Sequence, residues 1–390
     1  MGSSVKLVFQ QDGSNKFWNG SVEGNVFTVH YGRIGTAGQT LNKEFKTEAE
    51  AQKAFDQKRN EKLREGYSEG EAGAEPLPGD NGSRPYVHGN LAGFKVKKYA
   101  PKAKLADLNS TAYKFQLDYD DDAKYVDLLA QYTDSPGAAE TQAIVLGAWE
   151  DCSGGTNSEA IVEFLVSSSA KLPKLRAIYF GDIEQEECEI SWINQSDMSP
   201  LFLAYPKLQH FIVRGGTELT LGSIKHKALK SLVVETGGLP AGVIRDIGTS
   251  DLPELEYLEL WLGSANYGGD ATVSDLKGIL SGERFPKLKY LGLRDSEIAD
   301  EVAQAVAASP LYKRVEVLDL SMGALGDAGA EALLKSPATK KLKKLDLHWH
   351  YLSKGMISQL RALGMRLDVT EQQEADDPDD PTSRYIQVSE

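Results

Sequence analysis

Three glycines, Gly32, Gly35 and Gly38, recur at a spacing of three in the segment VHYGRIGTAGQT. Glycine-rich loops often hold phosphate, so this segment is a candidate nucleotide site. A loop of the Walker type requires a lysine and then a serine or threonine after its last glycine, and no such pair follows here. A dinucleotide-binding loop requires a helix directly after the glycines, whereas QTLNKEF alternates like a strand. We therefore expect a tight turn between two strands.

Acidic residues at positions 118, 120 and 122 of DYDDDAKYVDLL imitate the start of a calcium-binding loop. The sixth residue of such a loop should be glycine and the twelfth glutamate, but Ala123 and Leu129 stand there. We expect a charged turn that leads into a helix, with Val126 and Leu129 facing the core.

His348 and His350 in DLHWHYL are the histidine pair that most suggests a metal site. In the repeat register described below, His348 points away from the core on the concave side of a strand. His350 takes the position at the strand end that faces the core. Zinc requires several converging ligands, and the sequence offers no evident third partner. We expect a structural His350 beside an exposed His348, and no metal or other cofactor.

The two cysteines, Cys152 and Cys188, stand 11 and 13 residues after the starts of neighbouring repeats. We expect two buried thiols in adjacent coils rather than a redox pair, because neither belongs to a C-x-x-C motif. The sequence also lacks a G-x-S-x-G nucleophile motif. No set of catalytic residues assembles, and we expect a protein that is not an enzyme.

The bulk composition favours a cytoplasmic protein of two or more domains. The chain has 390 residues, of which 41% are hydrophobic and 26% charged, and two cysteines cannot form a disulfide framework. No window approaches eighteen uninterrupted apolar residues, and MGSSVK lacks an apolar signal core. We expect no contact with a membrane.

Charge is distributed unevenly along the chain. Residues 1–70 hold ten Lys or Arg and nine Asp or Glu, while the whole chain has a net charge of −14. The remaining residues therefore carry a net charge of −15 and repel nucleic-acid backbones. Any contact with nucleic acid must be local to residues 1–70, and we expect it to be weak.

The first 67 residues predict a small α+β module. Four segments, residues 5–10, 16–22, 25–31 and 39–45, alternate with the period of strands. A helix is expected from residue 47 to 64, with Thr47 and Glu50 as a capping box and Ala51, Phe55 and Leu63 on one face. Residues 68–87, rich in Gly, Pro, Ser and Glu, are expected to be a flexible linker.

The rest of the chain repeats the pattern L-x-x-L-x-L-x-x-N. Eight units begin at residues 141, 175, 208, 229, 255, 288, 315 and 342, at spacings of 21 to 34 residues. This periodicity is typical of a leucine-rich-repeat solenoid, an α/β fold with parallel strands on the concave side and helices on the convex side. We expect the solenoid over residues 141–370, an N-terminal cap over 88–140 and an acidic tail over 371–390. Residues 384–388 of that tail are expected to return to the body as a short strand.

The register of the repeats places charged and aromatic residues on the concave face. Exposed aromatic residues and arginines in a row are typical of a protein-binding surface, and Trp261 is the sharpest candidate. The alternative is that Trp261 packs on Tyr257 and Tyr290 or is covered by a loop. A second candidate is the acidic insertion at residues 181–197, which carries Trp192. The concave positions are His210, Arg214, Glu235, Tyr257, Glu259, Trp261, Tyr290, Arg294, Asp319, Asp346 and His348.

Residues 16–67, and more loosely residues 4–67, resemble the WGR domain, a module named for Trp-Gly-Arg. The resemblance rests on KFWNGS, FTVHYGRIGTAGQT and FKTEAEAQKAFDQKRNEKLREGY. In poly(ADP-ribose) polymerases this domain contacts DNA near strand breaks, which implies that Tyr31 and Arg33 take the roles of the Trp and Arg. The motif departs at Tyr31, where the family has Trp. Cations beside this motif that could also contact nucleic acid are Lys53, Lys58, Arg59, Lys62 and Arg64.

Residues 88–390 resemble a bacterial family of leucine-rich-repeat proteins of the ribonuclease-inhibitor-like type. The segments VVETGGLP, LELWLGSANYGGDATVSDL and LDLHWHYLS carry this resemblance, which implies no catalytic residues. We expect a non-enzymatic adaptor or regulatory scaffold whose concave face binds a protein partner. The WGR-like module would dock on nucleic acid or on a second protein. The alternatives are a DNA-end sensor acting through that module and, less favoured, a metal-dependent enzyme.

Overall fold

The computed structural model describes residues 4–11, 14–34, 36, 38–65, 67–69, 77–80, 83–87, 89–101, 103–105, 107–118, 123–152, 154–377, 379–380 and 382–390. The chain divides into two compact units, Met1–Val87 and His88–Glu390. We call the first the N-terminal module and the second the repeat domain, and each is described by itself.

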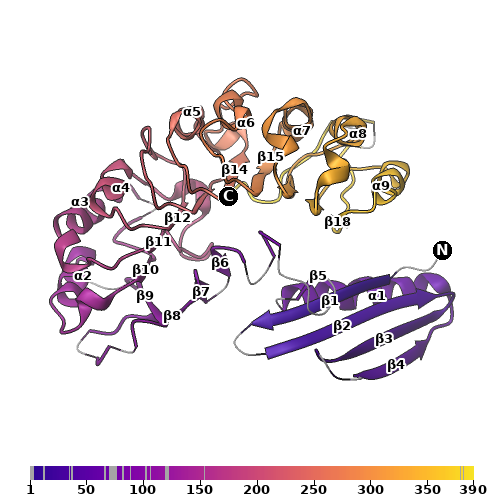
Figure 1. Ribbon diagram of the computed structural model, residues 1–390, viewed down its shortest axis with the longest axis horizontal. Helices are drawn as coiled ribbons and strands as arrows, with labels where there is room; N and C mark the ends of the chain where they lie inside the picture. Colours follow the sequence, from indigo (N-terminus) through magenta and orange to yellow (C-terminus); the bar gives the residue numbers. More distant parts are fainter. Residues whose placement is uncertain are drawn as a thin grey trace. The chain divides into compact units, whose positions relative to one another are not determined.

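The N-terminal module is an antiparallel sheet with one long helix, as the alternating pattern predicts (Figure 1). Its strands lie in the order β4-β3-β2-β1-β5. The helix begins where expected, since the amide of Glu50 donates to Thr47 Oγ1 at 3.2 Å. The elements are β1 (Ser4–Gln11), β2 (Ser14–Glu23), β3 (Val26–Arg33), β4 (Gln39–Glu44), α1 (Glu48–Arg64), β5 (Ser68–Glu69) and, at the boundary of the units, β6 (Tyr86–Val87).

One face of this sheet and the helix enclose a small core. Trp18 of β2 packs near Phe27 of β3, and Phe27 meets Phe55 of α1 edge-on at 5.8 Å. These rings, with Leu7 and Ala51, are buried. The predicted apolar helix face is confirmed at Ala51 and Phe55, while the side chain of Leu63 lies outside the described residues.

The glycine-rich segment is a turn between β3 and β4, as predicted. Gly38 has a φ of +66°, and a side chain there would lie 2.5 Å from the Phe17 ring and 2.8 Å from the Tyr31 carbonyl oxygen. A side chain at Gly32 would lie 2.7 Å from Gly38 Cα. Glycine is therefore required by the close approach of the backbone, while Gly35 lies outside the described residues.

The repeat domain is built on a long parallel sheet that curves into an arc (Figure 1). All eight predicted repeat strands form, each starting two residues after its unit begins. They run in register, so that Ala143, Ala177, His210, Ser231 and Tyr257 stand side by side. These strands are β10 (Ala143–Leu146), β11 (Ala177–Phe180), β12 (His210–Arg214), β13 (Ser231–Glu235), β14 (Tyr257–Gly263), β15 (Tyr290–Ser296), β16 (Val317–Asp319) and β17 (Lys344–Asp346).

The ends of the sheet extend beyond the predicted repeats. Residues 88–140, expected only to cap the first repeat, add β7 (Asn90–Leu91), β8 (Phe94–Lys98) and β9 (Thr111–Phe115) beside β10. At the other end β18 (Arg366–Asp368) pairs with β17. The short apolar runs of these strands lack the repeat motif, which is why its period does not predict them.

Helices line the outer side of the arc in Figure 1, and the core lies between them and the sheet. Leucines at the inward strand positions, such as Leu258 and Leu260, are fully buried against this layer. The helices are α2 (Tyr125–Thr133), α3 (Glu159–Ser167), α4 (Ser199–Ala204), α5 (Ala241–Thr249), α6 (Lys277–Ser281), α7 (Ala299–Ala308), α8 (Asp327–Lys335) and α9 (Lys354–Arg361). Single 3-10 turns are η1 (Ala138–Glu140), η2 (Ser169–Lys171), η3 (Ile190–Trp192), η4 (Ala265–Tyr267), η5 (Leu311–Lys313) and η6 (Thr339–Lys341).

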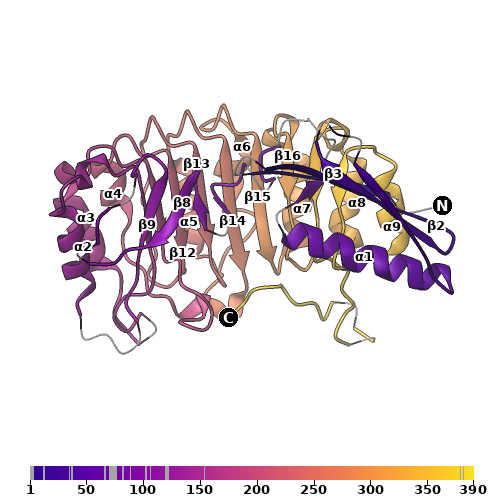
Figure 2. The ribbon, with the colours of Figure 1, turned by 90° about the horizontal axis from the view of Figure 1, so that it is seen from below.

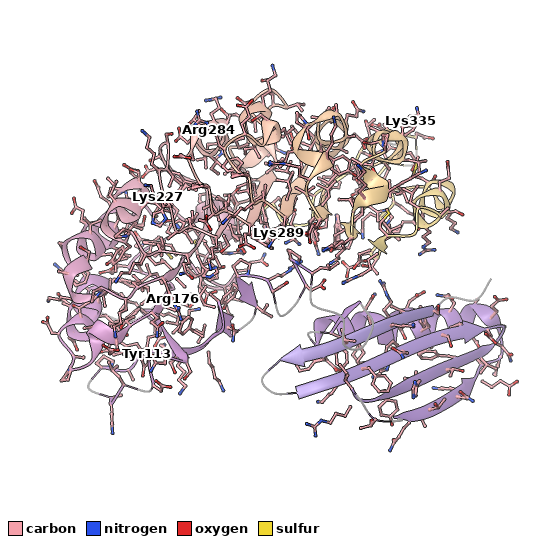
Figure 3. The ribbon with its side chains drawn as sticks, viewed as in Figure 1. Tyr113, Arg176, Lys227, Arg284, Lys289 and Lys335 are labelled. Carbon is pink, nitrogen blue, oxygen red and sulfur yellow. The ribbon has the colours of Figure 1, made fainter. Side chains whose placement is uncertain are left out.

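Ion pairs join successive coils along the rim from which the strands start. Lys289 pairs with Glu256 at 2.7 Å, and Lys343 pairs with Glu316 at 2.8 Å. Figure 3 labels Lys289, just before β15, and Arg176, just before β11; both lie on the strand side of the arc. Because these pairs are exposed to solvent, each stabilises the fold by less than about 1 kcal/mol.

Several predicted segments lie partly outside the described residues. These are 70–76 and 81–82 of the expected linker and 119–122 of the calcium-like segment. Within the described part, Val126 is half-buried and Leu129 is buried on α2, as predicted for a helix that follows the acidic run. Residues 384–388 do return to the body, but as an irregular segment rather than the predicted strand.

Candidate functional site

The concave positions predicted from the repeat register converge on the inner side of β12 to β17. Residues two apart in a strand share a face, so Tyr257, Glu259 and Trp261 of β14 stand opposite to the buried leucines of that strand. Parallel pairing places Tyr290 beside Tyr257 and Arg294 beside Trp261. We call the following set the inner-face cluster: Arg214, Glu235, Tyr257, Glu259, Trp261, Tyr290, Arg294 and Asp319.

Two stacked tyrosines form the centre of the cluster. The rings of Tyr257 and Tyr290 lie 4.0 Å apart with an interplanar angle of 4°. The Tyr257 hydroxyl donates to Glu259 Oε2. The Tyr290 hydroxyl lies 2.7 Å from Asp319 Oδ2 and 3.0 Å from Glu259 Oε2, and burial raises its pKa well above the usual value. The stack therefore holds at fixed positions two carboxylates from β14 and β16, the strands on either side of β15.

Arg294 balances the charge of these two carboxylates. Its Nη1 donates to Glu259 Oε1 at 2.6 Å and its Nε donates to Ser321 Oγ at 2.9 Å. Asp319 Oδ2 lies 3.5 Å from the same Nε. The Arg294 side chain is 5% exposed, so both partners and the guanidinium are shielded from water. Buried charges of this kind require such pairing and hydrogen bonding.

Trp261 is half-buried and lies between two arginines. Its Nε1 donates to Glu259 Oε1 at 2.9 Å, which fixes the orientation of the indole. The guanidinium carbons of Arg294 and Arg214 lie 5.4 Å and 5.9 Å from its ring centroid. The ring is thus not fully exposed but half-buried beside two guanidinium groups.

Arg214 and Glu235 form the more accessible end of the cluster. Arg214 Nη1 pairs with Glu235 Oε2 at 3.2 Å, and the two side chains are 17% and 15% exposed. The hydroxyl of Tyr179 donates to the same carboxylate oxygen at 3.1 Å. Among the described residues, Arg214 Nε is a buried donor without a hydrogen-bond partner. Burial raises the pKa of Glu235 despite the adjacent arginine.

His348 and Asp346 form a separate pair on the same face. His348 Nδ1 lies 2.8 Å from Asp346 Oδ1, and Lys344 Nζ lies 2.9 Å from the other carboxylate oxygen. Burial opposes ionisation of Asp346, but Lys344 and His348 hold its pKa well below the usual value. The carboxylate in turn raises the pKa of His348 in spite of burial.

His210 is half-buried at the start of β12. Its Nδ1 lies 2.8 Å from Ser231 Oγ. Burial, with the cations Lys230 and Arg176 nearby, lowers its pKa to about 4. The imidazole is therefore neutral at physiological pH and acts as a hydrogen-bonding group.

The exposure of the predicted residues differs from the sequence-based expectation. Six of them are buried, because side chains of adjacent strands pair with one another across a concave surface where neighbouring strands stand about 4.8 Å apart. These six are Tyr257, Glu259, Tyr290, Arg294, Asp319 and Asp346. The positions in which a protein ligand would find accessible atoms are Arg214, Glu235, Trp261, His210 and His348.

Sequence reasoning missed three residues that complete these contacts. Tyr179 and Lys344 occupy the same alternating strand positions as their partners, so the two-residue period could have identified them. Ser321 follows β16 at an unspecified position of the repeat motif, and its role depends on the path of the loop.

The residues considered for metal or redox chemistry make contacts within the repeat domain. The Leu352 amide donates to His350 Nδ1 at 3.0 Å, and His350 Nε2 lies 3.2 Å from the Val369 carbonyl oxygen. Within the part of the chain that is described, no group of three or more His, Cys, Asp or Glu side chains could hold a metal ion. Cys152 and Cys188 are buried as expected and close to each other, since a hydrogen bond between the thiols lowers the pKa of Cys152.

In the N-terminal module, Tyr31 and Arg33 lie at the end of β3. The Tyr31 hydroxyl donates to Gln39 Oε1 at 3.0 Å, while its ring packs against the small core. Arg33 is exposed. The structure pairs Lys58 with Glu61 at 2.5 Å and Lys62 with Glu65, and Arg59 also has an interaction partner.

The acidic insertion at residues 181–197 is a structured loop. Gln195 Nε2 donates to the Arg214 carbonyl oxygen at 2.7 Å, and the Gln195 amide donates to the Thr217 carbonyl oxygen at 2.8 Å. Trp192 in η3 is 59% exposed.

As to membranes, none of the helices among the described residues combines the length and the apolar composition needed to cross a bilayer.

Comparisons with known proteins identify the first part of the chain and a full-length relative. Residues 3–74 match the family described as the WGR domain. The crystal structure of a Bacteroides fragilis protein from the Northeast Structural Genomics Consortium is similar over 99% of both chains, with 31% sequence identity and a TM-score of 0.65.

Two further similarities are more limited. The uncharacterized protein YfeS of Escherichia coli (strain K12) is 33% identical over 64 residues, which are 16% of this chain and 26% of that protein. This chain therefore spans about a quarter of the length of that relative. An internalin from Listeria monocytogenes is 16% identical, and the similarity covers 60% of this chain and 68% of the internalin chain with a TM-score of 0.25.

Proposed function

Because this chain carries a WGR domain and belongs to the same family as the Bacteroides fragilis protein, we propose that it is a non-enzymatic adaptor or regulatory scaffold. The repeat domain, as a leucine-rich-repeat solenoid of the ribonuclease-inhibitor-like type, would bind a protein through its concave face. The WGR domain would dock on nucleic acid or on a second protein. We propose a cytoplasmic location.

The observation that carries this proposal is the fixed position of Trp261 between Arg214 and Arg294. Tryptophan and arginine are the residues most enriched among those that dominate binding energy at protein interfaces. Their rotamers here are already held by Glu259 and Glu235. Binding of a partner to Trp261 and Arg214 therefore costs less side-chain entropy than binding to mobile side chains would.

Partner capture from the native cell would test this face. The Trp261→Ala variant should retain less than about a tenth of the partner, since truncation of a central tryptophan costs on the order of 2 kcal/mol or more. Trp192→Ala is the matched control, because it removes an exposed tryptophan outside the cluster. Equal capture by the wild type and Trp261→Ala would reject the concave face as the binding surface.

A DNA-end sensor is the second candidate, supported by the exposed Arg33 beside Tyr31 in the WGR domain. Lys58 is already paired with Glu61, so Arg33 should contribute more to phosphate binding. Fluorescence anisotropy of the full chain with nicked duplex DNA should show a salt-dependent signal that Arg33→Ala reduces more than Lys58→Ala. Absence of binding at micromolar protein would exclude this candidate.

Partner capture with and without nuclease would separate the two candidates. A partner that remains after nuclease treatment supports the adaptor, whereas one that is lost is bridged by nucleic acid.

A further inference from the structure

The last seven residues of the chain, 384–390, lie across the rim where the strands end, and we call them the strap. Figure 2 shows the yellow C-terminal segment returning along one edge of the sheet towards the middle of the arc. Its contacts reach from the loop after β17, at Tyr351, to the loop after β13, at Gly237. The strap therefore crosses the ends of several coils, in the direction opposite to the order of the repeats.

The first strap residue fills a socket built for an arginine. Arg384 Nη1 pairs with Asp300 Oδ2 at 3.2 Å and donates to the Ala324 carbonyl oxygen at 3.1 Å. The guanidinium carbon also lies 5.6 Å from the Tyr351 ring centroid. A side chain at Gly326 would lie 2.1 Å from Nη1, so the socket depends on a glycine at that position.

The backbone of the strap is held by specific hydrogen bonds. The Tyr385 amide donates to the Tyr351 hydroxyl at 2.9 Å, and the Gln387 amide donates to the Met322 carbonyl oxygen at 2.8 Å. The Val388 amide donates to Asp295 Oδ1 at 3.0 Å. Side chains alternate as in a bound peptide, with Ile386 buried and Tyr385 63% exposed.

The segment that connects the strap to the repeats is acidic and makes contacts within itself. The Asp376 amide donates to the Ser383 carbonyl oxygen at 2.9 Å, and the Asp380 amide donates to that of Asp377 at 3.1 Å. A short tether of this kind presents its end at an effective concentration in the millimolar range. The strap can thus occupy the rim with modest intrinsic affinity.

We propose that the rim is a peptide-binding groove and that the strap is its intramolecular ligand. The groove takes an extended segment of a partner protein with an arginine and, two residues later, an aliphatic side chain. Carboxylates of Glu297 and Asp300 lie along this part of the rim, and the repeat domain is acidic as a whole, so the partner segment is basic. The partner displaces the strap to bind. This goes beyond the adaptor function and does not rest on it.

A peptide-binding experiment with the full chain tests the proposal. The probe is a fluorescein-labelled peptide of sequence RYIQVSE, and the receptor is the full chain with Arg384→Ala and Ile386→Ala, which weaken its own strap. We expect this variant to bind the probe at least tenfold more tightly than the wild type, whose strap competes. The same peptide with alanine in place of arginine should bind at least tenfold more weakly than the probe.

A third substitution tests the socket itself. Gly326→Ala, added to the receptor, should weaken binding of the probe about as much as the alanine substitution in the peptide does, because the new methyl group displaces the guanidinium from its position. Its effect on folding should be small, since the backbone there is extended, with φ of −115°. Gly355→Ala is the control, because open space surrounds that residue up to Ser353 Oγ at 3.7 Å. Equal affinity of the wild type and the strap variant, or no binding to a folded strap variant, would overturn the proposal.

Hydrogen exchange of the wild type provides a measurement that needs no substitution. Excess unlabelled RYIQVSE peptide should accelerate exchange of the Gln387 and Val388 amides, because the strap leaves its acceptors. Unchanged exchange at peptide concentrations of several millimolar would overturn the proposal as well.

Discussion

At the scale of single residues, Arg294 shows how the inner face can hold charge without water. Its guanidinium compensates two carboxylates from the strands on either side, Glu259 and Asp319. Removing one member of such a buried network leaves the others desolvated and unpaired, which is more costly than losing a surface ion pair.

We therefore expect Arg294→Ala to lower the free energy of unfolding by about 3–5 kcal/mol. Arg245→Ala is the matched control, because Arg245 is 60% exposed in its pair with Asp275 and should cost less than about 1 kcal/mol. Urea denaturation monitored by circular dichroism would measure both. Similar losses for the two variants would contradict the buried network.

Asp295 predicts a pH dependence of stability. Burial raises its pKa from the usual 3.8 to about 7, and its Oδ2 is a buried acceptor without a partner among the described residues. The folded chain therefore binds a proton between about pH 4 and 7 that the unfolded chain has lost. This contribution stabilises the fold at low pH and is lost as the pH rises through 7.

The Asp295→Asn variant removes that titration. Its stability relative to the wild type should increase from pH 5 to pH 8 by about 3 kcal/mol, because the difference grows by ~1.4 kcal/mol per pH unit until the pH reaches the folded pKa of about 7. Thermal or urea unfolding at several pH values would measure the difference. A constant difference across this range would show that Asp295 is ionised throughout.

The identity of the inner-face residues could be predicted from sequence, but their burial could not. Alternation along each strand places Tyr257, Glu259 and Trp261 on one face. Whether such residues point into solvent or pair with each other depends on the curvature of the sheet and on rotamers. The stack of Tyr257 on Tyr290 and the position of Arg294 above Trp261 follow from that geometry.

At the scale of elements, two helices of the convex layer meet through glycines. A side chain at Gly278 of α6 would lie 2.7 Å from the Gly248 carbonyl oxygen and 2.8 Å from Gly248 Cα of α5. Because the obstacle is backbone, the two helices would have to move apart to accommodate it.

Gly278→Ala should therefore destabilise the repeat domain by about 1–3 kcal/mol, as overpacking does. Gly242→Ala, on α5 with open space around it, should be neutral or stabilise by up to about 1 kcal/mol through better helix propensity. Differential scanning fluorimetry would measure the change in melting temperature of both variants. A neutral Gly278→Ala would mean that the helices shift without cost.

The elements themselves were the most predictable part of the structure. The spacing of the leucine motif predicted all eight repeat strands. β8, β9 and β18 were not predicted, because their sequences lack the repeat motif and their pairing depends on neighbours distant in sequence.

At the scale of the whole molecule, each unit has its own core. Trp18 belongs to the small cluster of the N-terminal module, and Leu258 belongs to the large cluster of the repeat domain. Separate cores unfold as separate cooperative units when few contacts couple them.

We expect calorimetry to resolve two transitions. Trp18→Ala should lower the midpoint of one transition by several degrees, because deletion of a buried ring costs about 3–5 kcal/mol. Leu258→Ala should lower only the midpoint of the other transition. If either substitution shifted both transitions equally, the two units would fold as one.

The division into two parts could be read from composition, since residues 68–87 are poor in apolar side chains. The docking of the strap could be predicted only in part from the sequence. The apolar and arginine residues of RYIQV indicate return to the body, but the socket of Arg384 combines Asp300, Ala324 and Gly326, which no local pattern brings together.

The parallel sheet has a mechanical consequence. The backbone of each strand from β10 to β17 pairs with the strands of the coils before and after it, so once the strap has detached, a pulling force on the C-terminal end meets one strand interface at a time. Under tension the coils would therefore detach one after another from the C-terminal end. Each detached coil of about 27 residues would lengthen the tether by roughly 90–100 Å.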